Sequence, residues 1–250
     1  MTSALRIPHF DDLQPIIMSL PVGRALERAD LLREEFRVHK DGNIEAYFMP
    51  SDGLNPAATL LLAGITPGWT QMELAYREVR RSIAAGMSAA DARMSARYVA
   101  GFGGSMRKNL VSMLDGIGVA EVLDVRSTER LFAADRAHVH STSVFRHPVF
   151  IRGKNYTGHG GHLERSAFGQ ACIRDLFVSE LDALPEALVV PMGGFVSGVI
   201  KDLVSRNLLD ERRCLMGFPH PSGANGHRRS QFEAQKSELM EKTRIWLRRS

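Results

Sequence analysis

Residues 58–68 read ATLLLAGITPG, and this stretch decides the fold class. Ala58–Gly64 is an unbroken apolar run that ends in glycine, which is typical of a short strand buried on both faces of a sheet. A second run of the same kind, ALVVP, lies at 187–191. Helical patterns separate the two runs, and strands that alternate with helices indicate a parallel sheet with helices on both faces. We therefore expect an α/β fold.

The remaining elements are read from their hydrophobic periodicity. Helices are expected over residues 71–85, 88–98, 106–116, 163–181, 195–205 and 230–247, after two short helices before residue 35 that are broken at Pro21. Further strands are expected over 43–49, 121–125, 138–145 and 213–217. Ser88 and Asp91 have the spacing of a capping box at a helix start.

Length and composition narrow the class of protein. The chain has 250 residues, of which 44% are hydrophobic, and it shows neither repeats nor a Pro- and Ser-rich linker. We expect a single domain over 1–250, with 1–57 as a lead-in and 58–250 as the core. Two cysteines, Cys172 and Cys214, are too few for a disulfide framework, an iron–sulfur cluster or a four-cysteine zinc site.

Neither a signal peptide nor a membrane span is expected. The first residues, MTSALRIPHFDD, carry acids where a signal peptide has its apolar run. The longest apolar stretch, 187–200, contains Pro191 and two adjacent glycines and is too short to cross a bilayer. We expect a cytoplasmic protein.

Positive charge gathers at the C-terminal end. The net charge of the chain is +4, yet the forty residues from Glu211 onward hold nine basic residues, Arg248 and Arg249 among them, against four acids. This distribution is equally compatible with a solvated helix face and with a surface that attracts a polyanion.

Two loops stand directly after expected strands, where ligands bind in parallel α/β sheets. The first, Gly64–Trp69, has two glycines around a proline, so its backbone can approach a bound ring closely. The second, 218–229, reads FPHPSGANGHRR and holds His220 between two prolines. A histidine fixed in this way can aim one hydrogen-bond donor at a defined point.

Together these segments resemble the uracil-DNA glycosylase superfamily. The matching motifs are GITPG at 64–68, GFGGS at 101–105, TSVF at 142–145, ALVVPMG at 187–193 and HPSGAN at 220–225, in the family's order over about residues 58–235. The resemblance implies a three-layer α/β/α fold with a central, mostly parallel sheet of about four strands. It also implies a monomeric, cofactor-free hydrolase of DNA repair that flips uracil out of the duplex and cuts its N-glycosidic bond.

The resemblance also implies a role for each matched residue. His220 would stabilise the departing uracil anion, Phe102 would stack on the base, and Thr66 would hold the attacking water. The substrate-binding candidates are Gly64, Ile65, Pro67, Gly68, Phe102, Ser143 and Asn155. The candidates for contact with DNA are Ser222, Gly223, Ala224, Asn225, His227, Arg228 and Arg229.

The sequence departs from the family's pattern at two places. Branches of the family carry a carboxylate or an asparagine in the first loop, at the positions that hold Ile65 and Thr66 here. The base-reading asparagine is replaced by Ser143, which leaves Asn155 in the segment RGKNYTG as the other source of an amide.

Three alternatives remain open on the sequence alone. A glycosylase for another deaminated base, hypoxanthine or xanthine, would use the same parts. A nucleic-acid-binding protein without chemistry would explain the missing carboxylate. A metal-dependent hydrolase would use the pairs His138 with His140 and His159 with His162. Of these, we expect uracil release without a metal or cofactor, in the cytoplasm and on nucleoid DNA.

Overall fold

The computed structural model describes residue 5 and residues 7–133, 135–160 and 162–247. The chain divides into two compact units, each built from three separate segments. Unit 1 comprises Met1–Leu54, Ile65–Gly101 and Ser143–Phe177, and unit 2 comprises Asn55–Gly64, Phe102–Thr142 and Val178–Ser250. Arg248 and Arg249, which were counted in the C-terminal charge, lie outside the described residues, as do residues 1–4 and 6. The assignment of one domain over 1–250 stays a prediction.

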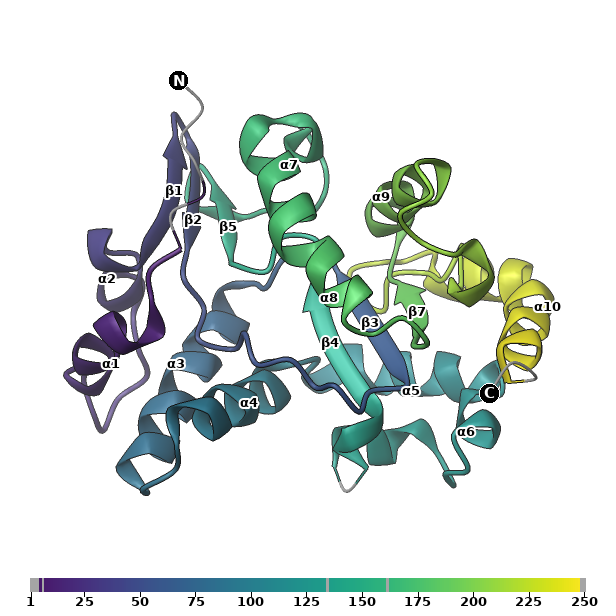
Figure 1. Cartoon of the computed structure of the whole chain (residues 1–250), viewed down its shortest axis with the longest axis horizontal. Coiled ribbons are helices and arrows are strands. Elements are labelled where there is room, and N and C mark those ends of the chain that lie inside the picture. The colour runs from purple at the N-terminus through teal and green to yellow at the C-terminus, as the bar shows by residue number, and fades with distance from the viewer. Residues whose placement is uncertain (1–4, 6, 134, 161, 248–250) are drawn as a thin grey trace. The chain divides into compact units, whose positions relative to one another are not determined.

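Unit 2 contains the sheet that the apolar runs predict (Figure 1). Its strands are β3 (Leu60–Gly64), β4 (Val139–Ser143) and β7 (Leu188–Pro191), in the order β4-β3-β7. β3 and β7 are parallel, and every residue of β7 is buried, as expected for a strand covered on both faces. Cys214 extends the sheet by a parallel bridge to Val189. The α/β class is therefore confirmed.

Helices pack on this sheet and make the core of unit 2. They are α5 (Gly104–Gly116), α6 (Val119–Val122), α8 (Val178–Asp182), α9 (Gly194–Ser205) and α10 (Arg228–Leu247), with 3-10 turns at Thr128–Phe132, Arg136–His138 and Glu211–Arg213. Alternate residues of the strands, Leu60 and Leu62 with Leu188 and Val190, pack in one cluster with apolar side chains of α5 and α10. The period of two along each strand places these residues on the same face.

Two expected strands of this unit differ in the structure. The prediction of a strand over residues 121–125 is wrong, because α6 and a turn occupy these residues. Gly118 is left-handed (φ 83°), and the N–H of Val122 then bonds to the Gly118 carbonyl in helical fashion. The expected strand 213–217 is reduced to the bridge at Cys214, preceded by the Glu211–Arg213 turn. In both places the backbone forms bonds within a turn instead of pairing over the expected length.

Unit 1 has a second, antiparallel sheet that the sequence analysis did not predict in full. Its strands β1 (Arg37–Asp41), β2 (Ile44–Tyr47), β5 (Val149–Ile151) and β6 (Lys154–Asn155) pair in that order. Only β2 lies in an expected strand. The helices of the unit are α1 (Phe10–Met18), α2 (Arg28–Leu31), α3 (Trp69–Ala84), α4 (Ala89–Ala100) and α7 (Ala167–Cys172), with a π-helix at Ile173–Phe177 and 3-10 turns at Glu34–Phe36 and Leu163–Arg165.

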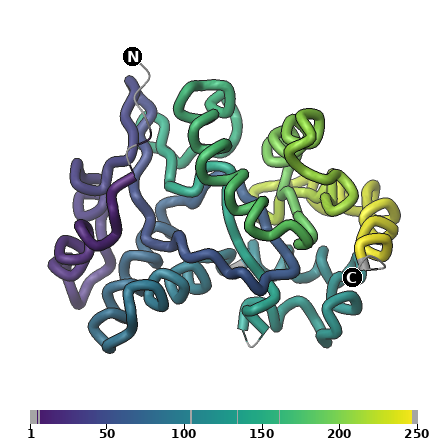
Figure 2. The backbone as a smooth tube through the Cα atoms, in the orientation of Figure 1, coloured from purple at the N-terminus to yellow at the C-terminus, as the bar shows by residue number. Residues whose placement is uncertain are grey.

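Several expected details of the helices are confirmed. The Ser88 hydroxyl accepts the Asp91 N–H at 3.1 Å, so Ser88 is the N-cap of α4 as expected. The Asp91 carboxylate bonds to the Ser88 hydroxyl at 2.6 Å, where a full capping box would use the Ser88 backbone N–H. The helix expected over 163–181 begins as a 3-10 turn and continues as α7, the π-helix and α8. This coiled part of the chain is green in Figure 2, and α7 with the π-helix belongs to unit 1.

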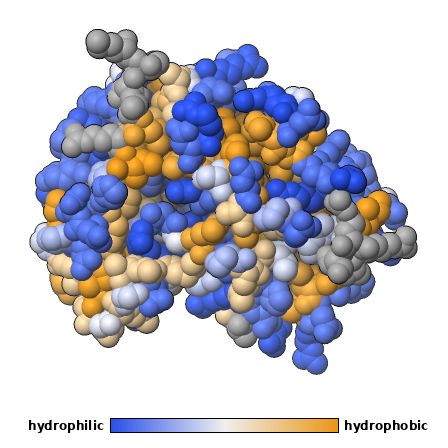
Figure 3. Space-filling view, viewed as in Figure 1, coloured by the Kyte–Doolittle hydropathy of each residue, from blue (hydrophilic) through white to orange (hydrophobic). Residues whose placement is uncertain are grey.

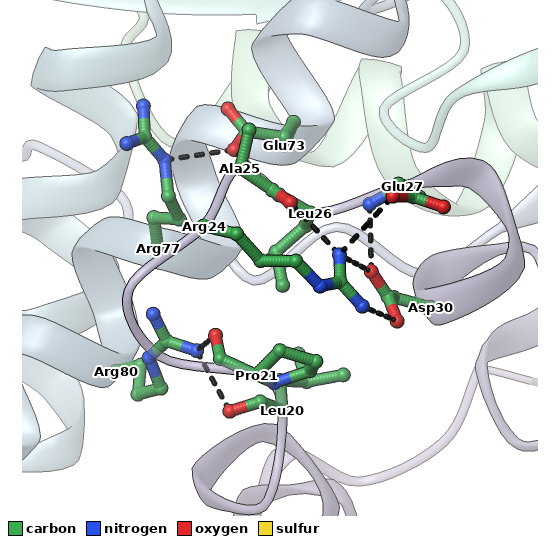
Figure 4. A network of polar contacts seen from close by, with 10 residues as sticks. All are labelled: Leu20, Pro21, Arg24, Ala25, Leu26, Glu27, Asp30, Glu73, Arg77 and Arg80. Atoms are coloured by element: carbon green, nitrogen blue, oxygen red, sulfur yellow. Dashed lines mark hydrogen bonds and ion pairs between the residues drawn. The ribbon is translucent and has the colours of Figure 1, made fainter.

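A network of polar contacts fastens the segment between α1 and α2 to α3 (Figure 4). The Arg80 guanidinium donates to the Leu20 carbonyl at 2.8 Å, and the Glu73 carboxylate accepts the Leu26 N–H at 3.2 Å. Arg24 forms a two-pronged ion pair with Asp30 of α2. These contacts hold α2 beside α3 within unit 1.

The surface shown in Figure 3 is mostly hydrophilic, with hydrophobic residues interspersed. Among the described residues, the large hydrophobic side chains that are exposed are Val22, Met87, Val99, Leu208 and Ile245. No helix in the described part of the chain has the length and apolarity that crossing a membrane requires.

Both cysteine thiols are free and buried, which leads to a first prediction. Burial raises the pKa of Cys172 and of Cys214 to about 12 each. Because the thiolate is the reactive form, we expect neither thiol to react with a disulfide reagent in the native protein at mildly alkaline pH. In denaturant both should react at once. Titration of free thiols before and after unfolding measures this, and rapid labelling of native protein would contradict the burial.

Candidate active site

The carboxyl ends of the strands in unit 2 bring two glycine-containing segments together. Gly193 follows β7 with φ 87°, and its N–H bonds to the Phe218 carbonyl at 2.9 Å. A Cβ on Gly193 would lie 3.0 Å from the Cβ of His220. A side chain at residue 193 would therefore be strained at this positive φ and crowded against His220, so the position favours glycine. His220, whose loop was expected after the strand 213–217, therefore lies next to the glycine that follows β7.

The hydrogen bonds of His220 fix which of its ring nitrogens donates. The Ser222 N–H donates to Nδ1 of His220 at 3.2 Å, so Nδ1 is the unprotonated nitrogen. In a neutral imidazole the proton is then on Nε2, which is left as a donor. Burial lowers the pKa of His220 below its ordinary value of 6.5, which favours this neutral form. The ring is thus a neutral, oriented N–H donor.

Side chains from two helices brace the loop that carries His220. Asn109 of α5 donates to the Pro221 carbonyl at 2.9 Å, and Arg228 of α10 donates to the Ser222 carbonyl at 2.9 Å. Asn225 donates to the His220 carbonyl at 3.2 Å. Restricting the loop in this way fixes the imidazole before any ligand binds. Sequence analysis missed Asn109, because nothing in the local pattern of α5 distinguishes it from a surface residue.

The candidates for contact with DNA lie in and after the same loop. Gly223, Ala224, His227 and Arg229 are exposed, whereas Ser222, Asn225 and Arg228 are half-buried. A Cβ on Gly223 would lie 3.5 Å from the Ser105 hydroxyl, so the segments GFGGS and HPSGAN lie next to each other. This proximity agrees with their predicted convergence. Arg228 is engaged as a brace, which leaves Arg229 as the more accessible cation.

Phe102 is placed in the core of unit 2. It is 8% exposed, and its ring meets the ring of Phe132 edge to face at 6.3 Å between centroids. Its backbone is left-handed with φ 37°, and Arg107 donates to its carbonyl at 2.6 Å. A base that stacks on Phe102 would need more of the ring surface than this conformation exposes.

The first loop changes unit at the peptide bond between Gly64 and Ile65, and its remainder is anchored in unit 1. The Ile65 carbonyl accepts the Phe145 N–H at 3.0 Å, so the segment after β4 lies beside this loop. The Thr66 hydroxyl donates to the His147 carbonyl at 2.9 Å and accepts the Val149 N–H at 3.1 Å. The single hydroxyl proton of Thr66 is donated to the His147 carbonyl. Thr66 could therefore bind a water molecule only by accepting a hydrogen bond from it.

The side chain of Asn155, in β6, lies against this loop near Trp69, the first residue of α3. Its Oδ1 accepts the Trp69 N–H at 3.2 Å, and its Nδ2 is 3.2 Å from the place of a Cβ on Gly68. Pro67, which precedes Gly68 in the loop, is buried. Asn155, which the sequence suggested as a residue that recognises the base, thus lies beside the Gly64–Trp69 loop. Its side-chain NH2 group is next to Gly68. Ser143, the other candidate, is the half-buried last residue of β4.

Two polar residues of α3 near the loop have structural roles. The Gln71 side chain accepts the Gly68 N–H at 2.8 Å and so caps the helix. The buried Glu73 carboxylate accepts the Leu26 N–H and pairs with Arg77 at 2.8 Å. Glu73 is therefore committed to holding the N-terminal segment, and the loop gains no carboxylate from α3.

Of the histidine pairs in the metal-dependent alternative, His138 and His140 have other polar partners in the structure. Nδ1 of His140 accepts the Asn55 N–H at 3.4 Å, and Nε2 lies 3.6 Å from the buried Glu180 carboxylate, while Nδ1 of His138 is 3.4 Å from the Thr59 hydroxyl. Across the described ranges no three His, Cys, Asp or Glu side chains are grouped to hold a metal ion.

Comparison with known proteins places the chain in a family without assigning a reaction to it. No protein-family model and no solved structure matches the sequence. The chain is 39% identical over 223 residues to the uncharacterized protein YoxB of Bacillus subtilis (strain 168), a match that covers 86% of this chain and 85% of YoxB. The match thus covers most of both chains. The chain belongs to the same family as YoxB.

Proposed function

We propose that this protein is a DNA glycosylase that removes uracil from DNA and leaves an abasic site. The observation that carries the proposal is His220, a neutral imidazole whose Nδ1 is bonded to the Ser222 N–H and whose Nε2 is a donor. It stands in a braced loop after the sheet, where parallel α/β proteins bind their ligands. The resemblance of the loop motifs to uracil-DNA glycosylases supports the choice of substrate.

The reaction needs a donor of this kind. The bond between C1′ of the sugar and N1 of uracil breaks, its electron pair leaves with the uracil ring, and the oxygen of a water molecule bonds to C1′. The proton that this water loses passes to the uracil anion, so the reaction balances without a cofactor. A fixed N–H donor facing the uracil oxygen stabilises the negative charge as it develops.

The resemblance to uracil-DNA glycosylases supplies the proposed roles of the other residues. Asn155, whose Nδ2 lies next to Gly68, supplies the amide that reads the base edge, in preference to Ser143. Gly64, Ile65, Pro67 and Gly68 present backbone to the base, and Phe102 reaches it only after a local rearrangement of its buried ring. The Gly223–Arg229 segment contacts the DNA, where Arg229 neutralises phosphate. We propose that the protein acts as a monomer in the cytoplasm, at the nucleoid.

A second candidate function, DNA binding without base release, is favoured by one observation. The Thr66 hydroxyl is occupied by His147 and Val149, and Glu73 is turned to Arg77, so the first loop has neither a general base nor a free hydroxyl proton. In this alternative the loops hold DNA, and no N-glycosidic bond is cut.

A cleavage assay separates the two functions. The substrate is a labelled oligonucleotide with one uracil, incubated with the protein and EDTA and then treated with alkali. We expect strand breakage at the uracil and none in the matched oligonucleotide with thymine there. An intact uracil strand, together with an intact hypoxanthine strand, would contradict the glycosylase. Retained DNA binding in that case would favour the second function.

A further inference from the structure

The hairpin of β5 and β6 has an arginine where its turn geometry disfavours one. Phe150 pairs with Asn155 and Ile151 with Lys154, which leaves Arg152 and Gly153 as a two-residue turn. Both turn residues are left-handed, with φ 51° and 72°. Such turns prefer Asn-Gly or Asp-Gly, because a larger side chain is strained at positive φ. Because backbone strain of this kind is concentrated at functional sites, the conformation of Arg152 suggests a use for its side chain.

The hairpin presents its cations to solvent. Arg152, Lys154 and Asn155 are all exposed, and no ion pair is found for Arg152 or Lys154 within the described part of the chain. Many other cations of unit 1 have a carboxylate partner, as Lys40 has in Glu45 at 3.3 Å. The two hairpin cations are therefore available to an external anion.

Arg28 of α2 holds the hairpin in a fixed position against the start of α3. Its guanidinium donates to the Gly153 carbonyl at 2.8 Å and lies 5.3 Å from the ring centroids of both Trp69 and Phe150. The segment just before Arg28 is bonded to α3 through Leu26 and Glu73, as Figure 4 shows. At the other side of the hairpin, the Asn155 amide caps the Trp69 N–H. The cations thus stand on a rigid support beside the Ile65–Gly68 loop.

We propose that this hairpin surface, formed by Arg152 and Lys154 and supported by Arg28, binds the phosphate backbone of a DNA strand. This inference rests on the proposed function, because it places the cations beside the loop that meets the base. It adds a second phosphate-binding element to the C-terminal one at Arg229. Cations of this kind act on every sequence alike, and their contribution is recognised by its dependence on salt.

The test is a titration of uracil-free DNA, single- and double-stranded, at several salt concentrations. The variant is R152N/K154Q, because asparagine suits the left-handed turn position and the hairpin should fold at least as well. We expect the slope of log affinity against log salt to fall in magnitude by about 1.4–1.8, which is the loss of two phosphate contacts. The melting temperature should stay the same or rise.

The control is K40A/R165A, which removes two exposed cations of unit 1 that already face Glu45 and Glu164. Its salt slope should equal that of the wild type. An unchanged slope in R152N/K154Q, or an equal loss in the control, would overturn the inference even if uracil is released. A reduced slope in a protein that releases no base would keep the inference and remove the glycosylase. Wild-type protein without affinity for DNA would overturn both.

Discussion

His220→Ala is expected to lower the rate of uracil release about 10²–10³-fold while changing the affinity for DNA little. The imidazole is a donor aimed at charge that appears only as the N-glycosidic bond breaks, so its loss affects the transition state more than the bound ground state. Single-turnover cleavage with enzyme in excess measures the rate, and a titration with an uncleavable oligonucleotide measures the affinity.

Two further variants make this result specific. His9 is exposed and makes no side-chain cap to α1, so His9→Ala removes a histidine without touching the loop and should leave the rate unchanged. His220→Gln retains an amide N–H donor and should recover part of the lost rate. If His220→Ala keeps nearly full activity, the anion-stabilising role is wrong. A parallel loss of DNA affinity would instead make His220 a binding residue.

The lowered pKa of His220 adds a dependence on pH. Because the folded protein binds this proton less readily than the unfolded chain, the group favours folding above the unfolded value of 6.5. That contribution is lost as the pH falls below 6.5, since protonation of Nδ1 removes the acceptor for the Ser222 N–H. The wild type should therefore lose more unfolding free energy on acidification than His220→Gln, as urea melts at several pH values would show. Equal losses would contradict the buried neutral imidazole.

The sequence predicted the parts of the fold that are governed by burial. Leu60–Gly64 and Leu188–Pro191 were predicted because strands covered on both faces must be apolar throughout. The strands β1 and β6 escaped prediction for the opposite reason. Arg37–Asp41 carries polar residues with one buried side chain, and Lys154–Asn155 is two exposed residues that are strand only through their partner β5. Pairing of this kind is a tertiary property that local composition does not carry.

The candidate site was predictable in position but not in the use of its polar groups. Loops that follow parallel strands must meet at one edge of a sheet, which is why His220 and Gly193 are neighbours. Whether the Thr66 hydroxyl is available depends on His147 and Val149, about eighty residues later in the chain. Hydrogen bonds over such separations are set by the folded structure, so the occupied state of Thr66 and the bracing by Asn109 had no local signal.

The second large effect is expected at Gly169 in α7. A Cβ on this residue would lie 1.9 Å from the Leu163 carbonyl oxygen, because the 3-10 turn at Leu163–Arg165 folds back closely onto the helix. Gly169→Ala must therefore displace backbone and not merely a side chain. Forced overpacking costs about 3 kcal/mol or more in such a case. For a chain of this length, that lowers the melting temperature by about 6–12 °C.

Gly198 in α9 provides the matched control, since it is also a helical glycine but has nothing within 4 Å of an added Cβ. Gly198→Ala should stabilise the protein by up to about 1 kcal/mol, because alanine is the better helix former. Opposite shifts from the same chemical change would locate the constraint in the packing at Leu163 and not in helix propensity. Thermal melts followed by circular dichroism measure both variants. If Gly169→Ala melts with or above the wild type, the close approach of the Leu163 carbonyl to α7 does not exist in solution, and the turn that begins this helix is differently formed.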